Sequence, residues 1–163
     1  EIDAKESPKR SYGKFIDAMN AAAKELGMDH SHFDNTHGLT EETHKASAAD
    51  MAKLAHALKQ IPFLQQVVST PQHGATVTGP GGYERNLLWK NTNNLLKIAG
   101  YDGVKTGTTS AAGACLVSSA TRGDDSLIVV VLGAPSSESR YVDSRNLYRW
   151  AWTQLEKRKA EGK

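Results

Sequence analysis

Two apolar segments joined by a short polar turn constrain the fold of this chain more than any other feature. Residues 114–121 and 126–133 are rich in β-branched and small apolar side chains, and Arg122-Gly123-Asp124-Asp125 separates them. This spacing is typical of a β-hairpin. Residues 127–132 form a continuous apolar run, which predicts a central strand covered on both faces. We therefore expect an antiparallel sheet with helices packed against it.

Helices are expected before and after these strands, which gives a mixed α/β (α+β) layer arrangement. Ser11 is a suitable N-cap for a first helix, which Gly27 would terminate. Ser47 and Asp50 form a capping box for a second helix, and Pro62 ends it. The expected helices cover residues 12–26, 47–60 and 141–155, with a further helical turn over 63–69.

The remaining segments are predicted to be less regular. The residues at the two ends, 1–10 and 156–163, are expected to be a polar lead-in and a charged tail that frays. A long ordered loop is expected over residues 28–46, a loop or weak hairpin over 70–82, and a loop over 136–140. In the mixed segment 86–94, Leu87, Leu88 and Trp89 are predicted to be buried and the asparagines to form turns.

Composition excludes several classes of protein. The 163 residues suffice for one domain with a core, and 39% hydrophobic with 23% charged residues is ordinary globular composition. A net charge of +2, without a basic run containing aromatics, argues against a nucleic-acid binder. No apolar run approaches the ~18 residues of a membrane span. No signal peptide opens the chain. Cys115 is the single cysteine, which excludes an internal disulfide, and its apolar neighbours predict burial.

A candidate ligand-binding strand covers residues 101–109. Asp102 and Gly103 suit a turn, and an extended run follows them. Strand alternation places Lys105 and Gly107 on the same face, so a cation lies beside a position without a side chain. An extended ligand could pair with this edge and place a carboxylate near Lys105. The alternative interpretation is a polar strand end with a solvated lysine.

The surrounding sequence resembles a known family over nearly the whole chain. Lys105-Thr106-Gly107 is a motif of serine β-lactamases and penicillin-binding proteins. The sequence resembles the serine D-alanyl-D-alanine carboxypeptidases, the low-molecular-mass penicillin-binding proteins of peptidase family S11. The matching segments occur in the family's order: residues 15–20, 24–28, 32–33, 37–39, 44–51, 85–89, 102–109, 112–113, 116–117 and 130–134.

The resemblance implies the serine β-lactamase and transpeptidase-like fold, an antiparallel sheet flanked by helices. It also implies that the fold is incomplete here. Residues 11–157 match the C-terminal portion of one catalytic domain, preceded by the lead-in 1–10 and followed by a tail at 158–163. The nucleophile, its lysine and the Ser-x-Asn motif would precede these residues. Three explanations fit: a nicked protein whose other piece is a separate chain, a deliberately shortened chain, or natural loss of the catalytic half.

Two short patterns mimic the absent motifs. Ser11-Tyr12-Gly13-Lys14 fits Ser-x-x-Lys, but this helix follows both absent motifs in the family, and Ser11 is better interpreted as a helix cap. Ser144-Arg145-Asn146 fits Ser-x-Asn, but it lies after the Lys-Thr-Gly strand, and we interpret it as a chance match.

The family's roles transfer to five residues by resemblance. Lys105 would hold the terminal carboxylate of the substrate and tune proton transfer, and Thr106 would hydrogen-bond that carboxylate. Gly107 would leave room for the substrate backbone. The backbone N–H of Thr108, where the family often has His, would be one oxyanion donor. Arg140 matches an arginine that supports the carboxylate-binding end, with a solvated surface arginine as the alternative.

Histidines provide a rival hypothesis. His30, His32, His37 and His44 could ligate zinc, but no cysteine joins them and their spacing matches no standard site. A Ser-His-Asp triad can also be assembled on paper, but the chain has too many serines for this match to be informative. We therefore expect neither a metal nor another cofactor.

The resemblance implies an enzyme that removes the terminal D-alanine from peptidoglycan stem peptides through an acyl-enzyme, and β-lactams would acylate the same serine. The implied location is the periplasm or envelope of a bacterium. The implied partners are the stem peptide, β-lactams and the N-terminal fragment as a separate chain. The alternative is a non-catalytic module that binds wall peptides or a partner protein.

Overall fold

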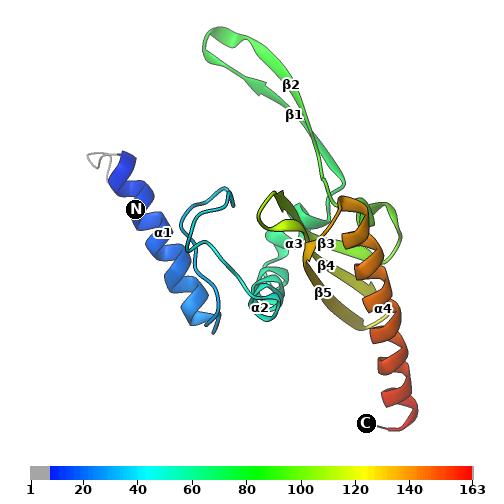
Figure 1. Ribbon diagram of the computed structural model, residues 1–163. Helices are drawn as coiled ribbons and strands as arrows, with labels where there is room; N and C mark the ends of the chain where they lie inside the picture. The colour runs from blue at the N-terminus through cyan, green and yellow to red at the C-terminus, as the bar shows by residue number, and fades with distance from the viewer. Residues whose placement is uncertain (1–7, 163) are drawn as a thin grey trace.

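A three-stranded antiparallel sheet lies at the centre of the structure, a computed structural model that describes residues 8–162 (Figure 1). Its strands are β3 (Tyr101–Thr109), β4 (Gly113–Arg122) and β5 (Asp125–Ala134), in the order β3-β4-β5. The predicted hairpin is therefore confirmed as β4 and β5. The apolar strand was expected to be central, but within residues 8–162 β5 forms one edge of this sheet.

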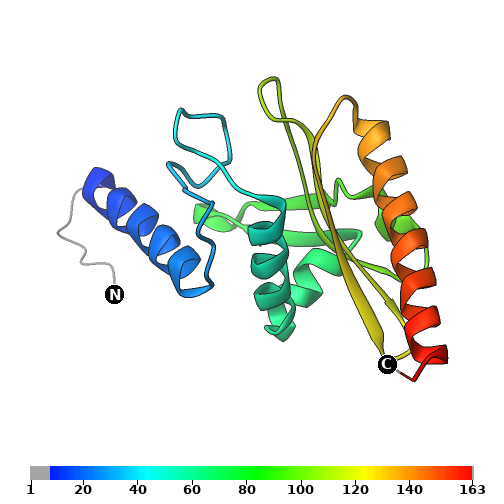
Figure 2. The same ribbon diagram turned by 60° about the horizontal axis from the view of Figure 1, so that its bottom comes forward.

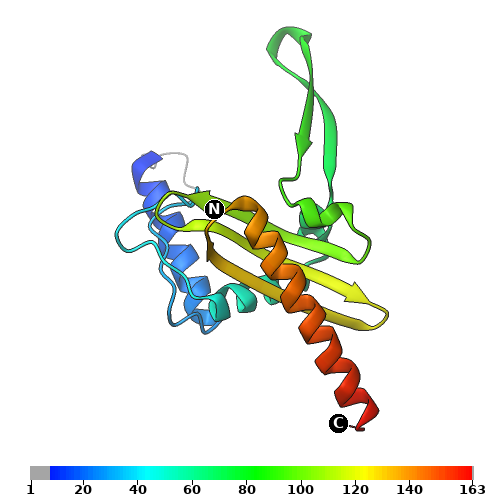
Figure 3. The same cartoon turned by 45° about the vertical axis from the view of Figure 1, so that its right-hand side comes forward.

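Helices cover both faces of the sheet, and this coverage explains the apolar run of β5. On one face α4 (Ser137–Ala160) packs Tyr148 and Trp152 against Val129 and Val131 of β5. On the other face lie α2 (Ala48–Lys59) and α3 (Pro62–Ser69), as the turned view shows (Figure 3). An apolar run in the sequence therefore indicates that both faces of a strand are covered by other elements. It does not indicate whether neighbouring strands pair with both edges of that strand.

The last helix is longer than the sequence predicted. Residues 136–140 were expected to be a loop, but α4 begins at Ser137 because Ser136 and Ser139 form a reciprocal capping box. The helix continues to Ala160, so most of the expected fraying tail is helical. Its buried residues include Tyr141, Ser144 and Trp152, whereas the apolar side chains of Val142, Leu147 and Trp150 are exposed.

The first helix, α1 (Pro8–Glu25), begins before the expected N-cap Ser11. Proline at the first helical position has a suitable backbone angle and needs no hydrogen-bond donor there, which explains the earlier start. Residues 8–10 therefore belong to a helix, and the rest of the expected lead-in lies outside the described residues. The apolar side chains of this helix are mostly open: Phe15 is 58% exposed, and among residues 9–25 only Ala23 is buried. The helix stands apart from the sheet (Figure 2).

A second, two-stranded sheet projects from the body of the molecule (Figure 1). It consists of β1 (Gln72–Thr78) and β2 (Glu84–Lys90), joined through a short 3-10 turn over Pro80–Gly82. The weak hairpin expected over residues 70–82 is thus one strand and its turn. Leu88 and Trp89 are 60% and 53% exposed, so their predicted burial is wrong. The side chain of Asn93 caps the 3-10 helix Asn94–Lys97, in agreement with its predicted role in a turn.

Asp50 anchors the long loop over residues 28–46 to α2. The predicted cap is present, since the amide N–H of Asp50 donates to Ser47 Oγ at 3.1 Å. The carboxylate of Asp50 turns to the loop, where it accepts hydrogen bonds of 2.9 Å from His30 N and Ser31 Oγ. Burial of the carboxylate acts to raise its pKa, but the hydrogen bonds from His30, Ser31, Lys53 and Ser47 outweigh burial and lower the pKa to about 2.

An Asp50→Asn variant should therefore show a weaker acid dependence of stability. A carboxylate whose pKa is lower in the folded chain stabilises the fold fully above its unfolded pKa of ~3.9, and this stabilisation is lost as the pH falls toward about 2. The stability difference between the two proteins should be constant above about pH 5 and shrink below about pH 4. Urea unfolding across this range measures it, with Asp17→Asn on the exposed side of α1 as control. A difference that grows on acidification would contradict the assignment.

Candidate substrate-binding site

The strand β3 forms the edge of the central sheet opposite β5. Within residues 8–162 no strand pairs with its outer side, so backbone groups there are available to an extended ligand. The side chain of Lys105 is exposed and its Nζ donates to the carbonyl oxygen of Thr106. A Cβ added at Gly107 would meet no atom within 4 Å. The predicted combination of a cation and an open position on β3 is therefore present.

The two threonines of this segment have different surroundings. Thr106 is 6% exposed, and its hydroxyl lies 2.6 Å from the hydroxyl of Thr92. Thr108 is exposed, and its hydroxyl accepts a hydrogen bond of 3.1 Å from Arg140 Nη1. The Thr106 hydroxyl is therefore held from inside the molecule, whereas the Thr108 hydroxyl is held at its surface.

Arg140, in the first turn of α4, connects this helix to β3. Its side chain is buried, and Nη1 also lies 3.3 Å from the carbonyl oxygen of Gly107 and 3.4 Å from that of Cys115. The guanidinium carbon lies 5.0 Å from the ring centroid of Tyr141. These contacts rule out a solvated surface arginine. They place a positive charge beside the Lys-Thr-Gly segment, and within residues 8–162 no carboxylate is among the hydrogen-bond partners of this guanidinium.

The opposite end of β3 is fixed by Asp102. Its carboxylate accepts hydrogen bonds from Lys59 Nζ at 3.0 Å, from Thr121 Oγ1 at 2.8 Å and from Ser119 Oγ. Burial acts to raise the pKa of Asp102, but the hydrogen bonds from Ser119, Thr121 and Lys59 together with the lysine charge lower it below its usual range. The sequence indicated only a turn at Asp102, because its partners lie far away along the chain.

Two further contacts that sequence reasoning missed also hold the strand. At the end of β3 the hydroxyls of Thr109 and Thr40 lie 2.9 Å apart, so the loop over residues 28–46 reaches this strand. The side-chain amide of Asn93 donates to the carbonyl oxygen of Gly103 at 2.8 Å. Threonine and asparagine occur in many turns, and nothing in their spacing identified these partners.

The rival site residues have structural surroundings. His44 Nδ1 accepts from the amide of Asp34, and His37 Nδ1 accepts from the amide of Leu39. Among residues 8–162 no three His, Cys, Asp or Glu side chains are grouped closely enough to hold a metal ion. Ser144 is fully buried, and its hydroxyl donates to the carbonyl oxygen of Arg140 at 2.7 Å.

Two other expectations concern Ser11 and Cys115. Ser11 lies inside α1, so its predicted capping role is wrong. Cys115 is only partly buried, and its sulfur contacts the carbonyl oxygen of Ala112 at 3.5 Å.

Across the described part of the chain, no helix is both long and apolar enough to cross a bilayer.

Comparison with known proteins agrees with the resemblance found in the sequence. A family model described as D-alanyl-D-alanine carboxypeptidase matches residues 8–136. The D-alanyl-D-alanine carboxypeptidase DacF of Bacillus subtilis is 36% identical over 144 residues, which is 88% of this chain and 36% of that protein. The D-alanyl-D-alanine carboxypeptidase of Streptomyces sp. strain K15 is 35% identical over 85% of this chain and 48% of its own length.

Solved structures show the same fold. The crystal structure of the Streptomyces K15 DD-transpeptidase matches with a TM-score of 0.88 and 31% identity, over 93% of this chain and 59% of that one. The mixed α/β class with a transpeptidase-like arrangement is therefore confirmed. The chain spans between about a third and a half of the length of these curated relatives. Sequence, fold and family model agree, and the chain belongs to the D-alanyl-D-alanine carboxypeptidase family, peptidase family S11.

Proposed function

We propose that this chain provides the substrate-binding strand of a serine D-Ala-D-Ala carboxypeptidase. The enzyme would cleave the terminal D-alanine from peptidoglycan stem peptides through an acyl-enzyme, and β-lactams would acylate the same serine. The observation that carries the proposal is the free edge of β3, with exposed Lys105 and open Gly107 beside the buried guanidinium of Arg140. The names of the related proteins support the same activity.

Each residue of the segment has a chemical task in this proposal. Lys105 and Arg140 provide positive charge for the terminal carboxylate of the peptide. The hydroxyl of Thr106 can donate to that carboxylate when Thr92 donates to it, because a hydroxyl donates once and accepts twice. Gly107 leaves space for the backbone of the ligand. The N–H of Thr108 would stabilise the oxyanion that forms when a serine attacks the carbonyl carbon.

The serine itself belongs to a part of the enzyme that precedes these 163 residues. That part would also provide the lysine that activates the serine and the Ser-x-Asn motif. Neither short mimic fits these roles, because Ser144 is buried in α4 and Ser11 lies within α1. A bacterial periplasm or cell envelope is the corresponding location, and the reaction requires no metal or other cofactor.

Intact-mass spectrometry of the purified protein, with and without benzylpenicillin, tests the proposal. If a second polypeptide accompanies this chain and carries the serine, that polypeptide should gain the mass of the drug. The gain should be about 10²–10³-fold slower with Lys105→Ala, the usual effect of removing one electrostatic group from such a site. Lys97→Ala outside β3 is the matched control. If the serine-bearing polypeptide is present and gains no mass, the acyl-enzyme proposal fails.

A preparation that contains only the 163-residue chain addresses the alternative. The proposal then expects no mass gain, and a gain on this chain would show that its nucleophile lies within these residues. Binding of a D-Ala-D-Ala peptide without acylation, weakened by Lys105→Ala, would support the substrate strand alone. Equal binding by both proteins would refute the assigned role of Lys105.

A further inference from the structure

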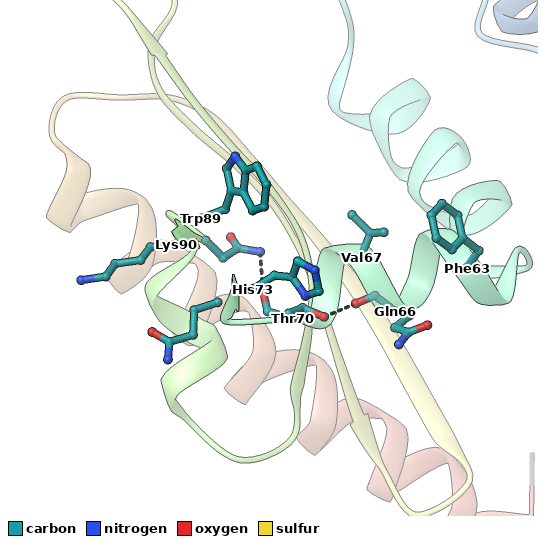
Figure 4. Close-up of a pocket in the computed structure, with 9 residues that line it drawn as sticks. Phe63, Gln66, Val67, Thr70, His73, Trp89 and Lys90 are labelled. Carbon is teal, nitrogen blue, oxygen red and sulfur yellow. Dashed lines mark hydrogen bonds between the residues drawn. The ribbon is translucent and has the colours of Figure 1, made fainter. Parts of the chain in front are cut away.

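Two pockets with different linings lie outside the Lys-Thr-Gly segment. One, of about 490 Å³, lies between α3 and the base of the β1–β2 hairpin, and Lys90 is the one lysine or arginine in its lining (Figure 4). The other, of about 290 Å³, lies between α4 and the adjoining ends of β3 and β4. Three arginines line this second pocket, Arg122, Arg145 and Arg149. We call it the arginine pocket.

Two of these arginines belong to α4. Arg145 and Arg149 are four residues apart, so their exposed side chains lie on the same flank of the helix. Like charges at this spacing repel each other and destabilise a helix. An anion bound between the two guanidinium groups would replace this repulsion with attraction.

The third arginine reaches the pocket from the sheet. Arg122 is the last residue of β4, and its guanidinium carbon lies 4.8 Å from the ring centroid of Trp152 in α4. The ring of Trp152 is buried, which gives the guanidinium a fixed surface to stack on. Stacking uses the flat face of a guanidinium and leaves the N–H groups at its edge available to a ligand.

The N–H donors of the three guanidinium groups are largely unused. Within residues 8–162 no carboxylate oxygen lies within 4 Å of them. Over the same residues, their one side-chain hydrogen bond joins Arg149 Nη1 to Asn146 Oδ1 at 3.5 Å, which is a long contact. Glu156 also lines the pocket, so three positive charges and one negative charge give the lining a net charge of +2.

The size of the pocket and its charge together limit the ligand. Its volume of about 290 Å³ is at the lower end of the ~300–1,000 Å³ that is typical of small-molecule sites. Trp152 is covered, so an aromatic ligand has no open indole to stack on. A carboxylate would neutralise only one of the two excess charges. A small anion with two charges therefore matches the lining.

We propose that the arginine pocket binds a phosphate monoester. Such a group carries a charge of about −1.5 to −2 at pH 7 and three strong acceptor oxygens. The fork of a guanidinium binds two phosphate oxygens in parallel, which explains why arginines and not lysines line the site. This inference goes beyond the proposed function, because the acyl transfer uses none of these side chains.

Titration of the ¹⁵N-labelled protein with glycerol 3-phosphate at constant ionic strength tests the proposal by NMR. The chain has three tryptophans, and only Trp152 lies in the arginine pocket. Its indole signal should shift with saturation, because the ligand would bind to the guanidinium stacked on it. The indole signals of Trp89 and Trp150 should stay in place, and they report whether each variant is folded.

Four variants of α4 separate the specific site from general attraction to a basic surface. Affinity should fall at least tenfold in Arg149→Ala and remain reduced in Arg149→Lys, which keeps the charge and loses the fork. It should be unchanged in the matched control Arg158→Ala, because residues nine positions apart lie on opposite sides of a helix. It should rise severalfold in Glu156→Gln, which removes the one negative charge of the lining.

A lipid head group and a soluble ester are the two sources of such a phosphate. Co-sedimentation with phosphatidylcholine vesicles that contain phosphatidic acid distinguishes them. Retention on these vesicles that is lost in Arg149→Ala would assign the lipid. Binding of glycerol 3-phosphate without retention on the vesicles would assign the soluble ester.

Three outcomes overturn the proposal. The first is no saturable shift of the Trp152 indole at millimolar glycerol 3-phosphate. The second is an equal shift with sodium chloride at the same ionic strength, which would show screening of charge alone. The third is equal affinity of the folded Arg149→Ala and Arg158→Ala variants. The probe contains no peptide or β-lactam, so its binding and the acylation of a serine succeed or fail independently.

Discussion

The Asp102→Ala variant is expected to lose about 2–3 kcal/mol of its free energy of unfolding, because it removes one partner of a partly buried ion pair and leaves the buried Ser119 hydroxyl without its acceptor. The side chain of Lys59 is only 13% exposed and donates to both carboxylate oxygens of Asp102. Ser119 is fully buried and would also lose its acceptor. Urea unfolding at pH 7 measures the loss, and hydrogen exchange of the β3 amides shows whether the strand opens locally.

Asp125→Ala is the matched control for this variant. Asp125 also pairs with a lysine, Lys159, but the two side chains are 31% and 57% exposed. Exposed ion pairs contribute at most about 1 kcal/mol, so the control should lose little stability. The pKa of Asp102 is lowered by folding, so its contribution is present above its unfolded pKa and declines on acidification. Equal losses in the two variants at pH 7 would contradict a special role for Asp102.

The Leu116→Ala variant is expected to lose about 3–4 kcal/mol, in the range found for fully buried leucines that leave a cavity. Leu116 has no exposed surface and packs with Leu95 and Tyr141. It pairs with Thr106 across the β3–β4 ladder, so the cavity would open beside β3. Thermal and urea unfolding measure the loss, and a fitted denaturant slope equal to that of the unmodified chain would show that the unfolding reaction is the same.

Leu88→Ala provides the comparison for Leu116→Ala, because Leu88 also lies in a strand but is 60% exposed. Its substitution should change stability by no more than about 0.5 kcal/mol. A loss from Leu88→Ala as large as that from Leu116→Ala would mean that the hairpin is packed against something outside this chain. A small loss from Leu116→Ala would mean that the core around Tyr141 can collapse into the cavity.

The elements that the sequence predicted well are those in which one short segment carries all the information. The β4–β5 hairpin needs only two apolar runs and a polar turn, and Ser47 caps α2 within three residues. The common face of Lys105 and Gly107 follows from strand alternation alone. The family resemblance added Arg140, whose contact with β3 no local pattern could have indicated.

The elements that local sequence patterns did not predict depend on partners that are distant in the sequence or on weaker local signals. β2 lacks an alternating pattern, because both of its faces are largely exposed and only pairing with β1 makes it a strand. The start of α4 was missed because its capping box has serine in place of the usual Glu or Gln at the third helical position. The edge position of β5 was missed because helices on both faces produce the same apolar run as a central strand does.

The attachment of β3 along its whole length has a consequence for the thermodynamics of ligand binding. Asp102 holds the first end of the strand, Arg140 and Thr92 hold the middle, and Thr40 holds the last residue. The conformational entropy of this strand is therefore lost when the protein folds and not when a ligand arrives. Differences in affinity among peptides that pair with β3 should then report the direct contacts of each peptide, with little contribution from ordering of the protein.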